Sequence, residues 1–394
     1  MIILRSWGFP NEWEFGQEIG HIGKSLADGH GFATMNVPTA KFTPVYPLLV
    51  GGAFVIFGVY SKAAAVILFL FQSIFAAVTA VCLAVLGSRF LGRKEGIMAG
   101  FMWAFYPGSI FYSVEAIWYS ELAVMLLLVL ITIAATTKPV HLSGRVASLG
   151  GLSGLLVLTD SSMTIYPALL LLWILYIWEI RFWKWIGLAV ICVIAAGVVV
   201  SPWGIRNWLV LRTPGILKSN FGLELFFGNN PYSSGGGIDK EREQALAALN
   251  QEEHAYQRGQ SEYVYFGYLQ NKALEWIRRH PLRFLQLTAK RFWYFWGKFP
   301  SIGPDRWRRV SRLHLVWYAP LAVLALYGFW YIIPCRRHLA PLWLFLVVYP
   351  LPYYITHVQL YRYRYPVEPF IVLLAAVPLT VWVGRCWSLT STRQ

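Results

Sequence analysis

The sequence has little charge for its length. Only 13% of its 394 residues are Asp, Glu, Lys or Arg, against roughly 25% in a typical soluble domain. Hydrophobic residues make up 57% of the chain, and they come in long blocks that do not alternate with polar residues. This composition excludes an ordinary soluble enzyme and predicts an architecture set by the lipid bilayer.

Cysteines are few and are poorly placed for cross-links or metal binding. Cys82 and Cys192 lie inside apolar blocks, whereas Cys335 and Cys386 lie near predicted cytoplasmic ends. These cysteines are not spaced as metal ligands, and none of them lies in a predicted external loop. The sequence therefore excludes a disulfide framework and a zinc site. P-loop, GxGxxG, HExxH and CxxC motifs are also absent from the sequence, so no motif indicates nucleotide or zinc-protease chemistry.

The net charge of +15 is compatible with nucleic-acid binding, but its distribution is not. The basic residues flank apolar segments or fall in one aromatic-rich stretch, a pattern typical of contact with anionic lipid. The sequence therefore predicts membrane lipids, and no nucleic acid, as the charged partners.

Membrane spans follow from the length of the apolar blocks, since a helix needs about 20 residues to cross the hydrocarbon core. The clear candidates are 62–88, 96–113, 119–137, 186–204, 314–333, 340–356 and 368–386. The stretch 147–178 is long enough for two spans with a break near Asp160. Residues 45–58 are shorter and contain Pro47, which favours an interfacial or re-entrant segment. The expected fold is an all-α integral membrane protein, a multi-span helical bundle with loop helices on its outer face.

Orientation follows from the loops that carry Lys and Arg, which are enriched on the cytoplasmic side. Loops near 89–94, 138–145, 181–184, 336–337 and 385–393 are basic, whereas loops near 114–118 and 159–162 are not. Residues 1–44, 206–312 and 357–367 then share the outer side. We expect an outer first loop (1–61), a bundle (62–205), an outer loop domain (206–312) and C-terminal spans (313–394). Because Met1–Leu4 resembles the end of an apolar stretch, we also expect a missing first helix.

A first group of candidate residues lies near the N-terminus: Glu12, Glu14, Glu18, His21 and Lys24. If residues 14–26 form a helix, Glu14, Glu18 and His21 share one face. A carboxylate there could act as a general base toward a hydroxyl or amine. An amphipathic helix lying on the membrane surface explains the same residues equally well.

Further acidic candidates lie at the outer ends of predicted spans. Glu115 and Glu121 flank Trp118 and Tyr119, where the helix dipole alone would stabilise a carboxylate. Substrate binding by Glu121 is the functional alternative. Asp160 is favoured as the N-cap of the helix that follows it.

Basic candidates lie at the same predicted boundary. Arg206, where the chain leaves the membrane, could hold a phosphate together with Lys218, because a guanidinium donates two parallel hydrogen bonds. Arg362 and Arg364, near His357, oppose the positive-inside trend, so we expect an anion such as a lipid phosphate to compensate them. Ordinary headgroup contact is the alternative.

The loop 206–312 is too long for a simple connector. Segments near 240–258, 261–280 and 281–299 have helical composition, with a break predicted at His280–Pro281. Residues 290–312 mix basic and aromatic side chains, which predicts an interfacial segment.

Several stretches carry a family resemblance. Residues 18–32 (EIGHIGKSLADGHGF), 38–47 (PTAKFTPVYP), 202–207 (PWGIRN), 219–229 (SNFGLELFFGN) and 362–369 (RYRYPVEP) occur in an order that resembles C-type (GT-C) membrane glycosyltransferases. The closest group is the family 39 type, related to protein mannosyltransferases and the lipid A aminoarabinose transferase.

The resemblance implies transfer of a sugar from a polyprenyl-phosphate donor to a glycan, lipid or protein acceptor at the periplasmic face of a bacterial inner membrane. Glu18 matches the acidic residue assigned as base, although many members have aspartate where this chain has Phe15, beside Glu14. We expect an inverting single displacement, with Arg206 and Arg362 or Arg364 holding the phosphate. A divalent metal is compatible but not required. A lipid-linked sugar flippase, a sugar-polymer ligase and an inactive truncated remnant stay open as alternatives.

Overall fold

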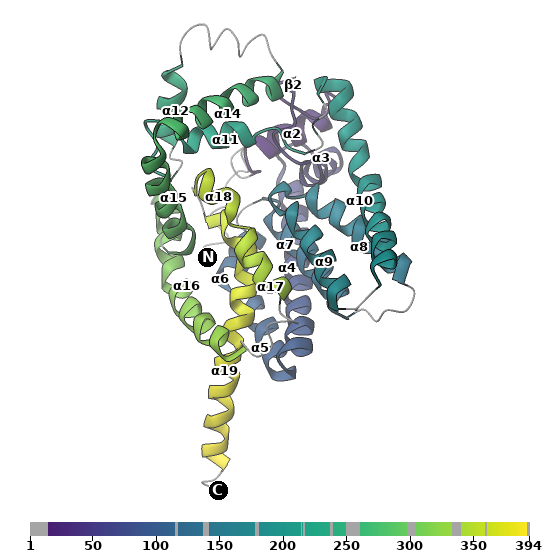
Figure 1. Ribbon diagram of the computed structural model, residues 1–394, viewed down its shortest axis with the longest axis vertical. Coiled ribbons are helices and arrows are strands. Elements are labelled where there is room, and N and C mark those ends of the chain that lie inside the picture. The colour runs from purple at the N-terminus through teal and green to yellow at the C-terminus, as the bar shows by residue number, and fades with distance from the viewer. Residues whose placement is uncertain are drawn as a thin grey trace.

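The computed structural model describes residues 15–114, 117–136, 142–177, 181–213, 215, 217–236, 239–249, 261–297, 305–332, 340–358 and 361–391. In these ranges the strands are limited to one antiparallel pair, β1 (Ala33–Thr34) with β2 (Val37–Pro38). Long helices stand side by side, and shorter ones cover one end of the bundle (Figure 1). The predicted all-α fold class is confirmed.

The bundle consists of α4 (Lys62–Phe90), α7 (Ser120–Thr136), α8 (Leu142–Val157), α9 (Ile165–Ile177), α10 (Phe182–Leu211), α16 (Asp305–Ile332) and α19 (Glu368–Ser391). Segments Lys62–Phe90, Phe182–Leu211 and Tyr365–Trp382 are long and apolar enough to cross a membrane. Val193 and Val198 of α10 are each 67% exposed, as suits a helix whose solvent is lipid. Gly150 and Gly154 bring α8 close to the backbone of α10, and small residues allow this contact between membrane helices.

Two predicted spans are each broken into a pair of helices. The stretch 96–113 forms α5 (Arg93–Ala104) and α6 (Pro107–Val114), and 340–356 forms α17 (Ala340–Val348) and α18 (Leu351–Ile355). Pro107 and Pro350 lie at these breaks, since proline cannot continue a preceding helix without losing a hydrogen bond. The break predicted near Asp160 is confirmed, because α8 ends at Val157 and α9 begins at Ile165.

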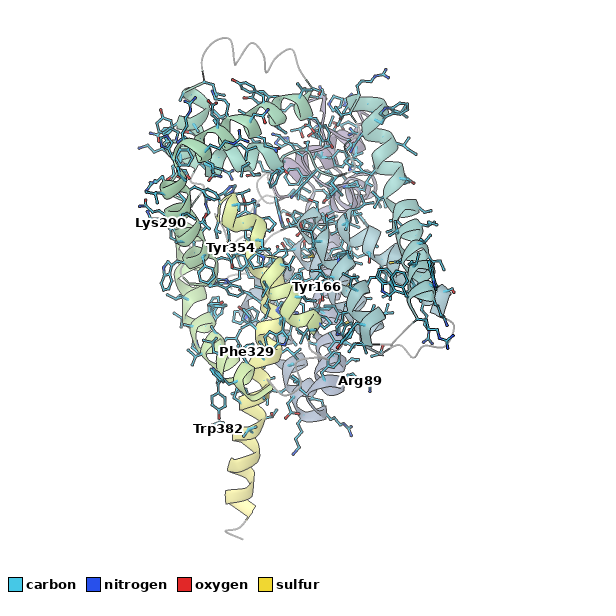
Figure 2. All side chains as sticks on the ribbon, viewed as in Figure 1. Arg89, Tyr166, Lys290, Phe329, Tyr354 and Trp382 are labelled. Atoms are coloured by element: carbon cyan, nitrogen blue, oxygen red, sulfur yellow. The ribbon has the colours of Figure 1, made fainter. Side chains whose placement is uncertain are left out.

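The remaining helices gather at one end of the molecule, which we call the loop end (Figure 1). They are α2 (Glu18–Ala27), α3 (Val45–Phe57), α11 (Phe221–Gly228), α12 (Asp239–Ala247) and α14 (Glu262–Arg279). From there α15 (Pro281–Trp296) leads toward α16, and the predicted break at His280–Pro281 is confirmed. Arg89 and Trp382 lie toward the opposite end (Figure 2).

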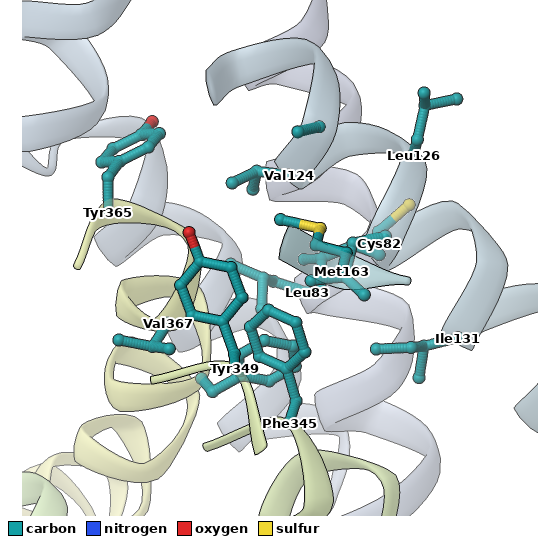
Figure 3. Packing of buried hydrophobic residues seen from close by; sticks show 14 of the residues in the cluster. Cys82, Leu83, Val124, Leu126, Ile131, Met163, Phe345, Tyr349, Tyr365 and Val367 are labelled. Carbon is teal, nitrogen blue, oxygen red and sulfur yellow. The ribbon is translucent and has the colours of Figure 1, made fainter. Parts of the chain in front are cut away.

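The first loop and the long loop form one structure at the loop end. The Glu262 carboxylate accepts hydrogen bonds from Thr39 Oγ1 at 2.7 Å, from the Ala40 amide at 2.5 Å and from Ser219 Oγ at 2.7 Å. The Ser219 amide also donates to the Ala40 carbonyl at 2.9 Å. Below them, the apolar core draws on both halves of the chain, for example Cys82, Phe345 and Tyr365 (Figure 3).

Candidate functional site

Trp118 is the point at which three distant chain segments meet. A Cβ added to Gly16, just before α2, would lie 3.0 Å from the Trp118 ring. The Phe42 ring packs edge-on against it at 6.0 Å. From the C-terminal part of the chain, the Arg362 guanidinium lies 4.3 Å from the centre of the Trp118 ring. The backbone here is held by Gln72, whose Oε1 accepts from the Trp118 amide at 3.2 Å.

Arg362 lies on a short 3₁₀ turn, η3 (Tyr361–Tyr363), and is half-buried. Its guanidinium stacks on Trp118 and lies 5.3 Å from the centre of the Tyr363 ring. Such stacking is worth about 0.5–2 kcal/mol and fixes the plane of the guanidinium. Because the rings cover its face, its edge can donate to a planar or phosphate anion.

Asp160 lies within electrostatic range of Tyr119, Tyr349 and Tyr353. Its carboxylate accepts from the Ser162 amide at 2.9 Å and caps the 3₁₀ turn η1 (Ser161–Met163), which confirms the capping prediction. Tyr353 donates to Ser162 Oγ at 3.1 Å, so the carboxylate lies among tyrosine hydroxyls. Tyr119 is within electrostatic range of both Asp160 and Arg362. A carboxylate and a guanidinium thus both lie near one tyrosine.

Glu18 begins α2 and stays accessible. Its side chain is 46% exposed, and Lys41 Nζ lies 3.7 Å from its Oε1. Its place in the first turn suits the positive end of the helix dipole. His21 lies one turn further along α2 and is half-buried. Glu14, the other predicted catalytic carboxylate, lies outside the described residues, as do Glu12 and Glu115.

His357 is buried and engaged with the long loop. Its Nε2 lies 2.7 Å from Arg242 Nη2 and 3.5 Å from Glu224 Oε2. Burial and the nearby charges of Arg242 and Arg291 lower the pKa of His357, so the ring is neutral and its Nε2 accepts from Arg242. The sequence predicted His357 but gave no sign of Glu224 or Arg242, which lie on helices α11 and α12.

Two other arginines, Arg206 and Arg364, donate hydrogen bonds to backbone carbonyls of the protein. Arg206 donates to the carbonyls of Phe32 at 2.5 Å and Thr39 at 2.8 Å, which braces the first loop against α10. Arg364 is fully buried, lies 3.3 Å from Glu368 and donates to two carbonyls at the end of α15. Phosphate binding by Arg206 and Arg364 therefore stays a prediction without support from their contacts. Lys218 is half-buried beside the Ser219 contact, and its phosphate role also stays a prediction.

Arg291 differs in burial from its neighbours Lys290 and Phe292. It belongs to the basic and aromatic stretch expected at the lipid surface, yet it is fully buried. It donates to the carbonyls of Gly228, Tyr354 and Ile355 and to Asn229. The sequence offers no signal that separates it from its exposed neighbour Lys290, because both lie in the same amphipathic helix.

Glu121, predicted to bind substrate, is fully buried in the first turn of α7 and accepts a hydrogen bond from Tyr365. Within the described ranges, no three or more His, Cys, Asp or Glu residues are grouped so that they could hold a metal ion.

No protein-family model matches the sequence, and a search of curated proteins finds no relative. Solved structures do match. The archaeal oligosaccharyltransferase AglB from Archaeoglobus fulgidus, in complex with an inhibitory peptide and a dolichol-phosphate, has a TM-score of 0.53 and 12% identity over 99% of this chain and 49% of that one. The same organism's oligosaccharyltransferase with Zn and sulfate has a TM-score of 0.50 and 14% identity, over 97% and 45% of the two chains.

The fold is that of the GT-C membrane glycosyltransferases. The chain spans about half the length of these oligosaccharyltransferases. ArnT from Cupriavidus metallidurans, bound to undecaprenyl phosphate, has a TM-score of 0.41 at 14% identity over 95% of this chain and 75% of that one. A likeness of that degree does not decide the family 39 assignment, which stays a prediction.

Proposed function

We propose that this GT-C chain is a membrane glycosyltransferase that moves a sugar from a polyprenyl-phosphate donor to an acceptor on the outer side of a bacterial inner membrane. The observation that carries the proposal is the meeting at Trp118 of the first loop, which bears Glu18, with the Arg362 guanidinium. A matched structure of the same fold is described with a dolichol-phosphate, which supports a lipid-phosphate donor.

Arg362 is our candidate for holding the donor phosphate. Its face is covered by Trp118 and Tyr363, which orients its remaining donors before the substrate arrives. When the bond from the sugar to phosphate breaks, negative charge grows on the departing phosphate. A fixed guanidinium stabilises this charge without having to reorganise.

Glu18 is our candidate base, because its carboxylate is accessible and starts a helix beside the Trp118 contact. It takes the proton of the acceptor hydroxyl or amine while the acceptor atom bonds to the anomeric carbon. The bond from that carbon to the phosphate oxygen breaks on the opposite face, and polyprenyl phosphate leaves. The configuration at the anomeric carbon is inverted. Asp160, more deeply buried near Tyr119, is the second carboxylate for this role.

Variants of the full chain in lipid nanodiscs test the proposal with a panel of undecaprenyl-phosphate sugars and acceptors. We expect Arg362→Met and Glu18→Gln each to lower turnover about 100-fold or more while insertion into the membrane is unchanged. Arg279→Met is the matched control, because Arg279 is 71% exposed and pairs with Glu275 on its own helix. Near-normal turnover in Arg362→Met would remove the phosphate role, and in Glu18→Gln it would remove the base assignment.

A further inference from the structure

A buried hydrogen bond links the two segments that carry the stacked pair Trp118 and Arg362. Glu121 follows Trp118 by three residues and Tyr365 follows Arg362 by three residues. The Tyr365 hydroxyl donates to Glu121 Oε1. Both side chains are fully buried.

The surroundings of this bond restrict how far either segment can move. The Tyr365 ring packs on Tyr112 at 4.4 Å and on Trp103 at 5.6 Å. Glu121 Oε1 also lies 3.5 Å from Ser113 Oγ, and Ser109 hydrogen-bonds to Tyr365. Residues of helices α6 and α7 therefore contact the chain between Arg362 and α19 and restrict its movement.

We propose that Tyr365 and Glu121 are positioning residues, whose hydrogen bond sets the register between the two segments and so holds the Arg362 guanidinium over the Trp118 ring. Neither side chain reaches the surface, so we assign both a positioning role. The consequence for donor binding rests on the proposed function, because it assumes that Arg362 holds the donor phosphate.

The main test measures how strongly the full chain in nanodiscs prefers undecaprenyl phosphate over uncharged undecaprenol. This ratio isolates recognition of the phosphate, because a general loss of stability weakens binding of both lipids. We expect Tyr365→Phe to lower the ratio about tenfold, since the phosphate is held by a charge-assisted hydrogen bond. Tyr166→Phe is the matched control: Tyr166 is also buried, and its hydroxyl donates to the Pro341 carbonyl at 3.0 Å. It should leave the ratio unchanged, and equal effects of the two variants would overturn the inference.

Rescue and coupling separate positioning from simple structural support. Glu121→Gln keeps an oxygen that accepts from Tyr365 and should retain the ratio, whereas Glu121→Met should lower it as Tyr365→Phe does. In an Arg362→Lys background, where the planar stack is lost, Tyr365→Phe should add less than about a twofold effect. Full additivity, or no rescue by Gln, would contradict the inference.

A measurement without ligand distinguishes failure of this inference from failure of the proposed function. The fluorescence of Trp118 is obtained by subtracting the emission spectrum of the Trp118→Phe variant from that of the protein in which Trp118 is intact. We expect this difference to change in Tyr365→Phe and to stay the same in Tyr166→Phe. An unchanged Trp118 signal overturns the positioning role. If the wild-type protein binds undecaprenyl phosphate and undecaprenol equally well, the proposal of a lipid-phosphate donor is wrong. The emission spectra then still test the positioning role of Tyr365 and Glu121.

Discussion

Glu262 connects the first loop to the long loop through hydrogen bonds. Its removal should make local opening easier in the segment that leads to the candidate site. In Glu262→Ala, the Ala40 amide and the hydroxyls of Thr39 and Ser219 lose the carboxylate that accepts from all three. A hydrogen bond to a charged group is worth about 1.5–3 kcal/mol when buried. The donor residues are buried, but Glu262 is only half-buried, so water can enter where its carboxylate is removed, and we assign about 1 kcal/mol to each bond.

The total is about 3 kcal/mol, which corresponds to a factor of about 100 in a local opening equilibrium. The Ala40 amide reports this opening directly, because it donates to the deleted carboxylate. We therefore expect its hydrogen exchange to be about 100-fold faster in the variant.

Hydrogen exchange followed by mass spectrometry over peptides covering residues 33–45 is the assay. Glu275→Ala on the same helix is the control: Glu275 is 58% exposed and pairs with Arg279, an arrangement worth at most about 0.5 kcal/mol. If the two variants exchange equally in this segment, the contacts of Glu262 do not hold the first loop and the reasoning is wrong.

Two further predictions concern the packing and titration of the site. Gly16→Ala should cost about 2 kcal/mol in thermal unfolding and lower transfer, because φ is +71° and the added Cβ would meet the Ile117 carbonyl at 2.8 Å. Gly29→Ala, at φ +81° in open space, should cost only about 1 kcal/mol and spare transfer; equal losses would contradict the packing argument. The pKa of His357 is lowered in the folded protein. Below about pH 6.5 the unfolded chain therefore binds more protons than the folded chain, and the free energy of unfolding decreases as the pH is lowered. His357→Gln should flatten this fall in thermal unfolding measured from about pH 8 to about pH 5, and an unchanged slope would refute the assignment.

The sequence predicted the bundle because the apolar length of a span is a local property. The break near Asp160 and the break before Pro281 were both predicted correctly. The spans 96–113 and 340–356 were predicted as single helices and are broken at Pro107 and Pro350. Hydropathy over a window does not register a helix end, since proline is apolar while it interrupts the hydrogen-bond ladder.

The site was harder to predict because its contacts join residues far apart in the sequence. Glu18 and Arg362 were identified as candidates from their residue types and the expected topology. The stack of Arg362 on Trp118 and the bonds of Glu262 to the first loop have no local pattern, because their partners are more than 200 positions away. Arg242 lies on an apparently ordinary charged helix, and only the fold brings it to His357.

The buried arginines Arg291 and Arg364 satisfy backbone carbonyls at helix ends. A helix that ends near the membrane leaves carbonyls without donors, and lipid cannot supply them. Arg291 donates to the last carbonyls of α11 and α18, and Arg364 to those at the end of α15. A guanidinium suits this task because it offers five donors in a fixed plane, which is also why sequence alone cannot separate it from a phosphate-binding arginine. Arg362 differs in its described contacts, which are to the aromatic side chains of Trp118 and Tyr363 instead of to carbonyls. Within the described residues, its charge is positioned by aromatic rings, which supports the proposed role of Arg362 in holding the donor phosphate.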